Sequence, residues 1–178
     1  MSTHTAAPTV GTYTVDPIHS SLGFSVGYQG VSIFRGTLMQ VAGRLANGRL
    51  EGTAPVESIS ITTPEAFRAH VLSAEFFDAE AHPEVSFAST SLDVQDDGRA
   101  RVRGDLTMKG VTHPIHATGR WTAPATDALG NTRANLALEA VIDRRQWGIS
   151  WNTPLPSGGD ALGNEVTLTI ALSLVAED

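Results

Sequence analysis

The segment Glu165-Val-Thr-Leu-Thr-Ile-Ala-Leu-Ser-Leu-Val175, close to the end of the chain, decides the fold class. Its large apolar side chains occupy every second position: Val166, Leu168, Ile170, Leu172 and Leu174 alternate with Thr167, Thr169, Ala171 and Ser173. Because successive side chains of a strand point to opposite faces, this segment predicts a β-strand with one buried face and one solvated face. Such strands are typical of antiparallel sheets.

The same period of two recurs along most of the chain. It is found in four further segments, at residues 22–28, 56–61, 100–108 and 136–142. In the segment 100–108 the polar face begins with Arg101 and Arg103, which would lie in water. These segments therefore predict further strands of the same sheet.

Short turn motifs separate several of these segments. Asn47-Gly48 is a strong signal for a type I′ hairpin, because both residues tolerate a positive φ. Asp97-Gly98 and Lys109-Gly110 occupy equivalent places before and after the segment 100–108. Together, segments and turns predict eight or nine strands in an all-β barrel or sandwich.

One stretch departs from the strand pattern. Thr63 is a candidate N-cap, Pro64 suits the first helical position, and Phe67 and Val71 are one helical turn apart. We therefore expect a short helical insertion between residues 63 and 81, placed to plug one mouth of a barrel.

Length and composition limit the function classes. The 178 residues fit one domain, expected over residues 11–176 after a flexible N-terminus at 1–10. The formal net charge of −7 argues against a nucleic-acid partner, and the absence of cysteine excludes thiolate chemistry. The N-terminus lacks the basic and apolar regions of a secretory signal, and no stretch is long enough for a membrane-spanning helix. We therefore expect a cytoplasmic protein.

Two histidine arrangements could carry chemistry. His113 and His116 form an H-x-x-H pair, but in a strand this spacing puts the side chains on opposite faces, so we predict no metal site. Asp16 and His19 could act as acid and base. No nucleophile motif accompanies them, so we expect that they bond to the backbone where the chain bends, and we predict no catalytic residue.

The aromatic residues and the strand faces bear on what fills the barrel. Phe, Tyr and Trp side chains could simply form a core, whereas the many Gly, Ala and Ser residues on the strand faces favour room for a ligand. A barrel filled by its own side chains, acting as a structural or assembly domain, stays an alternative.

The sequence resembles the YceI-like family of bacterial lipocalin-like proteins from Tyr13 to Val175. The resemblance rests on five blocks in order, at 13–26, 67–87, 104–112, 142–148 and from 165 onward, including Asp16-Pro-Ile-His19 and Ile142-Asp-Arg144-Arg-Gln-Trp147-Gly148. The chain departs from the family pattern at Val71-Leu72, at Asp143 and at Trp147.

This resemblance implies an eight-stranded antiparallel lipocalin-like barrel with a short helical insertion. Its hydrophobic tunnel would hold a long polyisoprenoid, an isoprenoid quinone or a similar lipid, with no other cofactor, and the protein would form a homodimer. The residues expected to line the tunnel are Leu22, Phe24, Val26, Tyr28, Phe76, Phe77, Phe87 and Trp147. Asp16, His19, His70 and Arg144 are expected at its mouth. The alternative function is a lipid isomerase or cyclase that uses Asp16 and His19.

Overall fold

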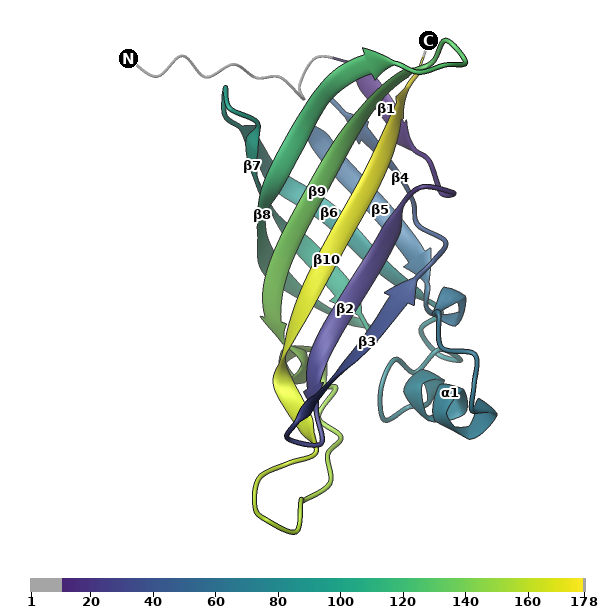
Figure 1. Ribbon diagram of the computed structural model, residues 1–178, viewed down its shortest axis with the longest axis vertical. Helices are drawn as coiled ribbons and strands as arrows, with labels where there is room; N and C mark the ends of the chain where they lie inside the picture. The colour runs from purple at the N-terminus through teal and green to yellow at the C-terminus, as the bar shows by residue number, and fades with distance from the viewer. Residues whose placement is uncertain (1–10, 178) are drawn as a thin grey trace.

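In the computed structural model, which describes residues 11–177, strands wrap around a common axis and one short helix lies beside them (Figure 1). The predicted flexible segment 1–10 lies outside the described residues. The strands are β1 (Thr12–Val15), β2 (Ser21–Tyr28), β3 (Ser32–Leu38), β4 (Ala42–Ala46), β5 (Arg49–Pro55), β6 (Glu84–Val94), β7 (Arg99–Met108), β8 (Val111–Thr126), β9 (Thr132–Asp143) and β10 (Leu162–Ala176).

The last strand closes the sheet into a barrel. β10 pairs with β9 along one edge and with both β1 and β2 along the other. β1 also pairs with β4, and β2 with β3, so β1–β2 and β3–β4 are two long strands, each interrupted once. The ten strands therefore form an eight-stranded antiparallel barrel, which confirms the predicted fold class.

The helical insertion is shorter than predicted. α1 runs over Glu65–Leu72, and Pro64 occupies its N-cap position without a side-chain cap, so Thr63 is not the cap. A turn follows the helix, in which the Ser73 hydroxyl donates to the His70 carbonyl oxygen at 2.6 Å. No helix of the described residues is long and apolar enough to cross a membrane.

The prediction of a strand at 56–61 was wrong. A 3-10 turn, η2 (Val56–Ser58), starts directly after β5. The chain turns away from the sheet here because two hydrogen bonds hold the turn. The Val56 amide donates to the carbonyl oxygen of Pro83, and the Ser58 hydroxyl donates to the carbonyl oxygen of Pro55 at 2.7 Å. Ile59 keeps one bridge to Leu38, so this segment touches the sheet edge without extending it.

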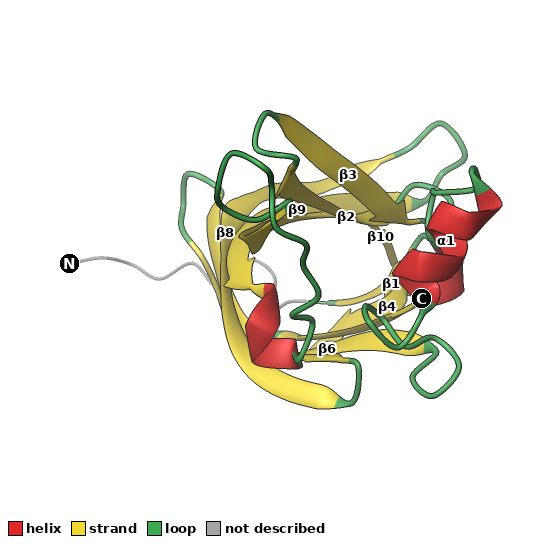
Figure 2. Ribbon diagram, turned by 90° about the horizontal axis from the view of Figure 1, so that it is seen from below, coloured by secondary structure: helices red, strands yellow, loops and turns green. Residues whose placement is uncertain are grey.

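The two ends of the barrel differ in packing. The upper end of Figure 1 is filled by side chains such as Leu45 and Leu174, which have no exposed surface, and by Tyr13 packed edge-on against Trp121. At the lower end α1 stands on one side, and the loop after the 3-10 turn η3 (Arg144–Trp147) crosses the opening (Figure 2). The interior is therefore accessible from the lower end.

Close contact between β8 and β9 depends on Gly119. A Cβ atom at this position would run into the carbonyl group of Ala137 on the neighbouring strand. We expect Gly119→Ala to lower the free energy of unfolding by about 3 kcal/mol, because backbone rather than a flexible side chain must move. Urea denaturation measures this change.

Gly23→Ala is the matched control. The nearest atom to its added Cβ would be the Thr169 carbonyl oxygen at 3.6 Å, an ordinary contact. Gly23→Ala should therefore lower the free energy of unfolding by less than about 1 kcal/mol. Equal losses in the two variants would show that the β8–β9 approach is not the constraint we describe.

Candidate functional site

Two adjoining cavities lie inside the barrel. The larger has a volume of about 300 Å³ and reaches the lower end, and the smaller, of about 80 Å³, lies deeper. Four side chains line both: Leu22, Val85, Leu106 and Leu168. The barrel is therefore not filled by its own side chains, and its two cavities adjoin at these four residues.

Seven of the eight residues expected along the tunnel line this space. Six of them line the larger cavity: Leu22, Phe24, Val26, Tyr28, Phe76 and Phe77. Phe87 lines the smaller one, as does Leu22. Five of these seven lie on β2 and β6, which shows that the inward face of β2 is the one that carries Leu22, Phe24, Val26 and Tyr28.

Glycines on neighbouring strands hold two of the aromatic rings against the wall. A Cβ atom at Gly36 would overlap the ring of Phe24, and one at Gly104 would overlap the ring of Phe87. The tip of each ring therefore lies over a position without a side chain. This arrangement leaves the centre of the barrel open although its wall contains large aromatic residues.

Trp147 is not where the sequence analysis expected it. It lines neither cavity and has no exposed surface. Its Nε1 donates to the Leu106 carbonyl oxygen at 2.9 Å, and its ring packs edge-on against His113. The reason is η3, which turns the chain after β9 and directs this side chain onto the main chain of β7.

His70 comes to the mouth of the larger cavity on α1. Its Nε2 lies 2.6 Å from a Glu75 carboxylate oxygen, and its ring packs edge-on against Phe76 and Trp151. Arg68 anchors the helix, since its guanidinium donates to main-chain carbonyl oxygens of the η2 segment, at Glu57, Ile59 and Ile61. The position of His70 thus depends on a helix fixed to the barrel edge.

Arg144 also lines the larger cavity, and it is buried. Its Nε donates to the Gly163 carbonyl oxygen and its Nη1 to that of Ile149, both at 2.7 Å, so it ties together the two ends of the loop after η3. Burial lowers the pKa of this guanidinium, which still keeps its charge at neutral pH. None of the ion pairs among residues 11–177 includes Arg144.

Several lining residues were not named by the sequence analysis. Phe34 lies opposite Val26 in the β2–β3 pairing, and Val166 and Leu168 belong to the apolar face of β10. Their alternation was a signal that could have identified them. Ile149 and Trp151, in the loop after η3, show no such period, so no sequence pattern marks them.

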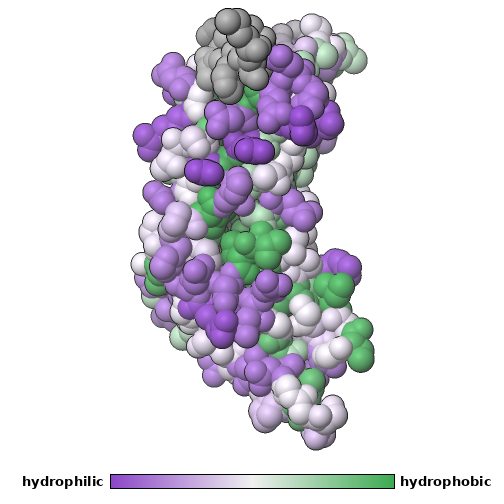
Figure 3. Space-filling model, turned by 90° about the vertical axis from the view of Figure 1, so that its left-hand side faces the viewer, coloured by the Kyte–Doolittle hydropathy of each residue, from purple (hydrophilic) through white to green (hydrophobic). Residues whose placement is uncertain are grey.

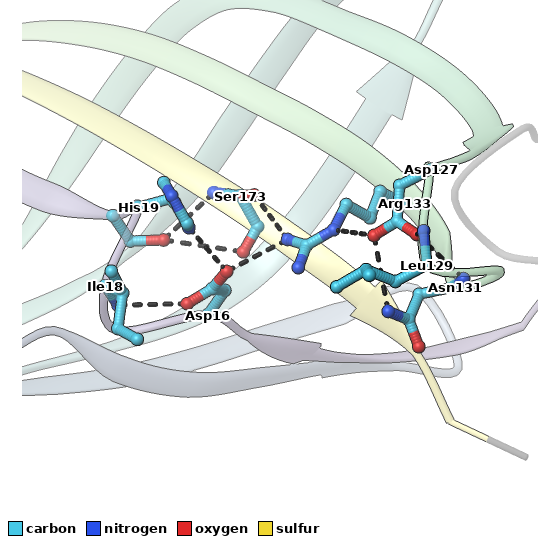
Figure 4. A network of polar contacts seen from close by, with 9 residues as sticks. Asp16, Ile18, His19, Asp127, Leu129, Asn131, Arg133 and Ser173 are labelled. Atoms are coloured by element: carbon cyan, nitrogen blue, oxygen red, sulfur yellow. Dashed lines mark hydrogen bonds and ion pairs between the residues drawn. The ribbon is translucent and has the colours of Figure 1, made fainter.

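Asp16 and His19, expected at the mouth, line neither cavity. They lie between β1 and β2, where Asp16 contacts His19 Nδ1 at 2.8 Å and accepts from Arg133 at 2.9 Å (Figure 4). Arg133 also bonds to Asp127 in the β8–β9 turn at 2.6 Å. The network joins the break between β1 and β2 to that turn.

This environment changes the ionisation of Asp16. Hydrogen bonds from His19, and then from Arg133, hold the pKa of its carboxyl well below the usual range. The carboxylate has 11% of its surface exposed, whereas the His19 side chain has 66%. Asp16 is therefore a charged structural acceptor for the chain bend.

The other histidine pair, His113 and His116, points to opposite faces of β8. His113 lies on the inward face of β8 next to Trp147, and His116 is exposed on the other face. Within residues 11–177, no group of three or more His, Asp or Glu side chains is placed to hold a metal ion. The outer wall over β7 and β8 is mainly polar, with apolar side chains in small separate groups (Figure 3).

With the barrel and its cavities established, comparison with known proteins decides the family. Residues 13–174 match the YceI-like domain. The chain belongs to the YceI-like family.

Two relatives agree with this assignment. A Staphylococcus aureus UPF0312 protein is 29% identical over 161 residues, covering 86% of this chain and 91% of the relative. A Pseudomonas putida UPF0312 protein is 27% identical over 137 residues, covering 74% and 71%.

Two solved structures share the fold of this YceI-like chain. BcnA of Burkholderia cenocepacia superposes with a TM-score of 0.70 at 18% identity, covering 89% of this chain and 98% of that one. A polyisoprenoid binding domain from Saccharophagus degradans, implicated in plant cell wall breakdown, gives 0.66 at 14% identity, covering 93% and 98%. At these identities the likeness establishes the fold.

The Asp16 network predicts a dependence of stability on pH. Because the folded-state pKa of Asp16 lies below its ordinary value of 3.8, its stabilisation is complete above about pH 5 and is lost progressively as the pH falls through 3.8 and below. Asp16→Asn should lower the free energy of unfolding at pH 7 by about 2 kcal/mol, and by less at pH 3. Urea denaturation at both pH values measures the difference.

Asp96→Asn, in the exposed β6–β7 turn, is the control. At both pH values its free energy of unfolding should stay within about 0.5 kcal/mol of that of the wild type. A loss for Asp16→Asn that is the same at pH 3 and pH 7 would contradict a role for the ionised carboxylate.

Proposed function

We propose that this protein binds and carries a long-chain isoprenoid, such as a polyisoprenoid or an isoprenoid quinone, or a similar amphipathic lipid, without catalysis. One observation carries the proposal: the larger cavity, of about 300 Å³, is walled by aromatic and aliphatic side chains and opens at one end of the barrel. Water is held poorly in such a space because it lacks hydrogen-bond partners, whereas an apolar chain fills it. The polyisoprenoid binding domain of S. degradans has the same fold, which supports the choice of ligand class.

The energetics suit a ligand held by its tail. Burying one methylene group contributes roughly 0.8 kcal/mol, so about ten enclosed carbons contribute on the order of 8 kcal/mol. Association and ordering costs offset part of this, which leaves roughly micromolar or tighter binding for longer chains. Tail burial alone therefore accounts for useful affinity.

Polar side chains are concentrated where the cavity opens. Gln29, His70 and Arg144 line the larger cavity in its lower part, on β2–β3, on α1 and after β9. We propose that His70 and Arg144 orient the head group of the ligand. A head group at this end would leave the tail pointing toward the smaller cavity, whose lining surface is almost entirely apolar.

The alternative function, a lipid isomerase or cyclase, depended on Asp16 and His19. Both lie outside the cavity lining, and Asp16 is engaged by Arg133. A ligand in the cavities would therefore not meet this pair, and the proposal assigns it no catalytic role. The expected homodimer and cytoplasmic location stay predictions.

Loading with a defined lipid tests the proposal. Delipidated protein mixed with geranylgeraniol, a prenol of twenty carbons, should show one bound molecule by native mass spectrometry. Organic extraction of protein purified without detergent should release a long-chain lipid. Delipidated, folded protein that takes up no prenol of any length would overturn the proposal.

A blocking variant tests the site of binding. Val85 lines both cavities, so Val85→Phe should narrow the passage and weaken binding of the twenty-carbon prenol by about tenfold or more. Val94→Phe is the matched control, because Val94 is buried in the same strand and lines neither cavity. Both changes overpack the barrel, so thermal unfolding is recorded for each. Equal prenol binding by the two variants would place the ligand elsewhere.

A further inference from the structure

The lower end of the barrel contains two neighbouring segments without charged residues. Ser20–Phe34 includes the β2–β3 hairpin, and Gln146–Gly159 includes the loop before β10; neither contains Asp, Glu, Lys or Arg, although these make up 17% of the chain. The two segments touch where Leu155 packs over Gly30. The Gln29 amide also donates to the carbonyl oxygen of Ala161 at 2.6 Å, beyond the exposed Asp160 that borders the second segment. They form a continuous edge, which we call the neutral rim.

The neutral rim exposes apolar side chains. At the hairpin, Val31 is 93% exposed and Ile33 is 54% exposed, and Tyr28 is also partly in water. The lowermost part of the molecule in Figure 3 is correspondingly pale to green, not the deep purple of the wall above it. Val31 and Ile33 line neither cavity, so contacts inside the barrel do not explain why these two positions are apolar.

The neutral rim is continuous with the mouth of the larger cavity. Tyr28 and Gln29 are exposed at the hairpin and at the same time line the cavity, and Trp151 lines it from the loop. A chain leaving the cavity at this point emerges next to Val31. The opposite side of the mouth, around α1, carries Glu65 and Glu75.

We propose that the neutral rim docks on the surface of a zwitterionic phospholipid bilayer, where the barrel takes up and releases its ligand. This inference rests on the proposed function, because a long-chain lipid resides in a bilayer. Apolar side chains such as Val31 and Ile33 gain by entering the lipid interface, and the two rim segments themselves carry no ionised group that has to be desolvated there. The charged Asp160 lies at the border of the rim, next to Pro154, and stays on its aqueous side in this arrangement. Tyr28 and Trp151 have the amphipathic rings that favour this interface.

Charge selects the kind of bilayer. The chain has a formal net charge of −7, so an anionic lipid surface would repel it. A zwitterionic surface exerts no such repulsion, and contact through an uncharged rim changes little with salt.

Vesicle binding and lipid transfer test the docking proposal. The wild type should sediment with sucrose-loaded phosphatidylcholine vesicles and transfer geranylgeraniol from donor to acceptor vesicles. The double variant Val31→Glu, Ile33→Glu should lose about tenfold or more in both measurements, because two charges would enter the interface. Its equilibrium loading with geranylgeraniol in the absence of vesicles should be unchanged, since neither residue lines the cavity.

The matched control adds the same charge at the other end of the barrel. Ile18 and Leu129 are 85% and 86% exposed, so Ile18→Glu, Leu129→Glu should behave as the wild type in sedimentation and transfer. Equal transfer by the two double variants would overturn the docking proposal. So would binding restricted to anionic vesicles and abolished by salt, or a hairpin variant that changes the oligomeric state while the wild type binds no vesicles. Absence of prenol loading in every protein would instead overturn the proposed function.

Discussion

The hydrogen bonds that β10 makes with β1 and β2 close the sheet, and the cavity exists because of this closure. An open sheet of these strands would expose two edges and one apolar face, and side chains would collapse onto that face. Closure instead fixes the diameter of the barrel, so that side chains pointing inward from opposite walls cannot fill the lower half. β1 and β2 share one partner strand, so the kink between them needs its own support, which Asp16 and Arg133 provide.

The shape of the internal space follows from how large and small residues are paired. Phe24 lies over Gly36 and Phe87 over Gly104, so these bulky rings lie close to the barrel wall. In the upper half the inward positions carry Leu45, Leu136 and Leu174, which meet and fill the barrel. The larger cavity therefore lies at the end of the barrel opposite these packed leucines.

The polar groups also divide into two sets, one that holds main-chain segments together and one that borders the cavity. The Asp16–Arg133–Asp127 network lies between β1, β2 and the β8–β9 turn, and its role is to hold main-chain segments together. Arg144 lies at the hollow end, where a buried positive charge borders an apolar cavity. The residues of the Asp16 network and the polar groups that can meet a ligand are thus different residues, and the uncharged rim lies beside the second group.

The sequence by itself determined most of the strands and several of the turns, because side-chain alternation and turn chemistry act between near neighbours. Alternation separates the two faces of β2, but only the closed barrel decides that the face with Leu22, Phe24 and Val26 points inward. Of the twelve residues expected at the cavity, seven of the tunnel residues and two of the mouth residues, His70 and Arg144, line it. The tertiary structure decided the rest. Trp147 lines neither cavity because η3 redirects the chain and packs its ring against His113 and the main chain of β7. Asp16 and His19 lie away from the cavity because the break between β1 and β2 faces another part of the barrel. Ile149 and Trp151 join the cavity through the loop that Arg144 ties to the start of β10. Such placements depend on contacts between distant segments, which local sequence patterns do not encode.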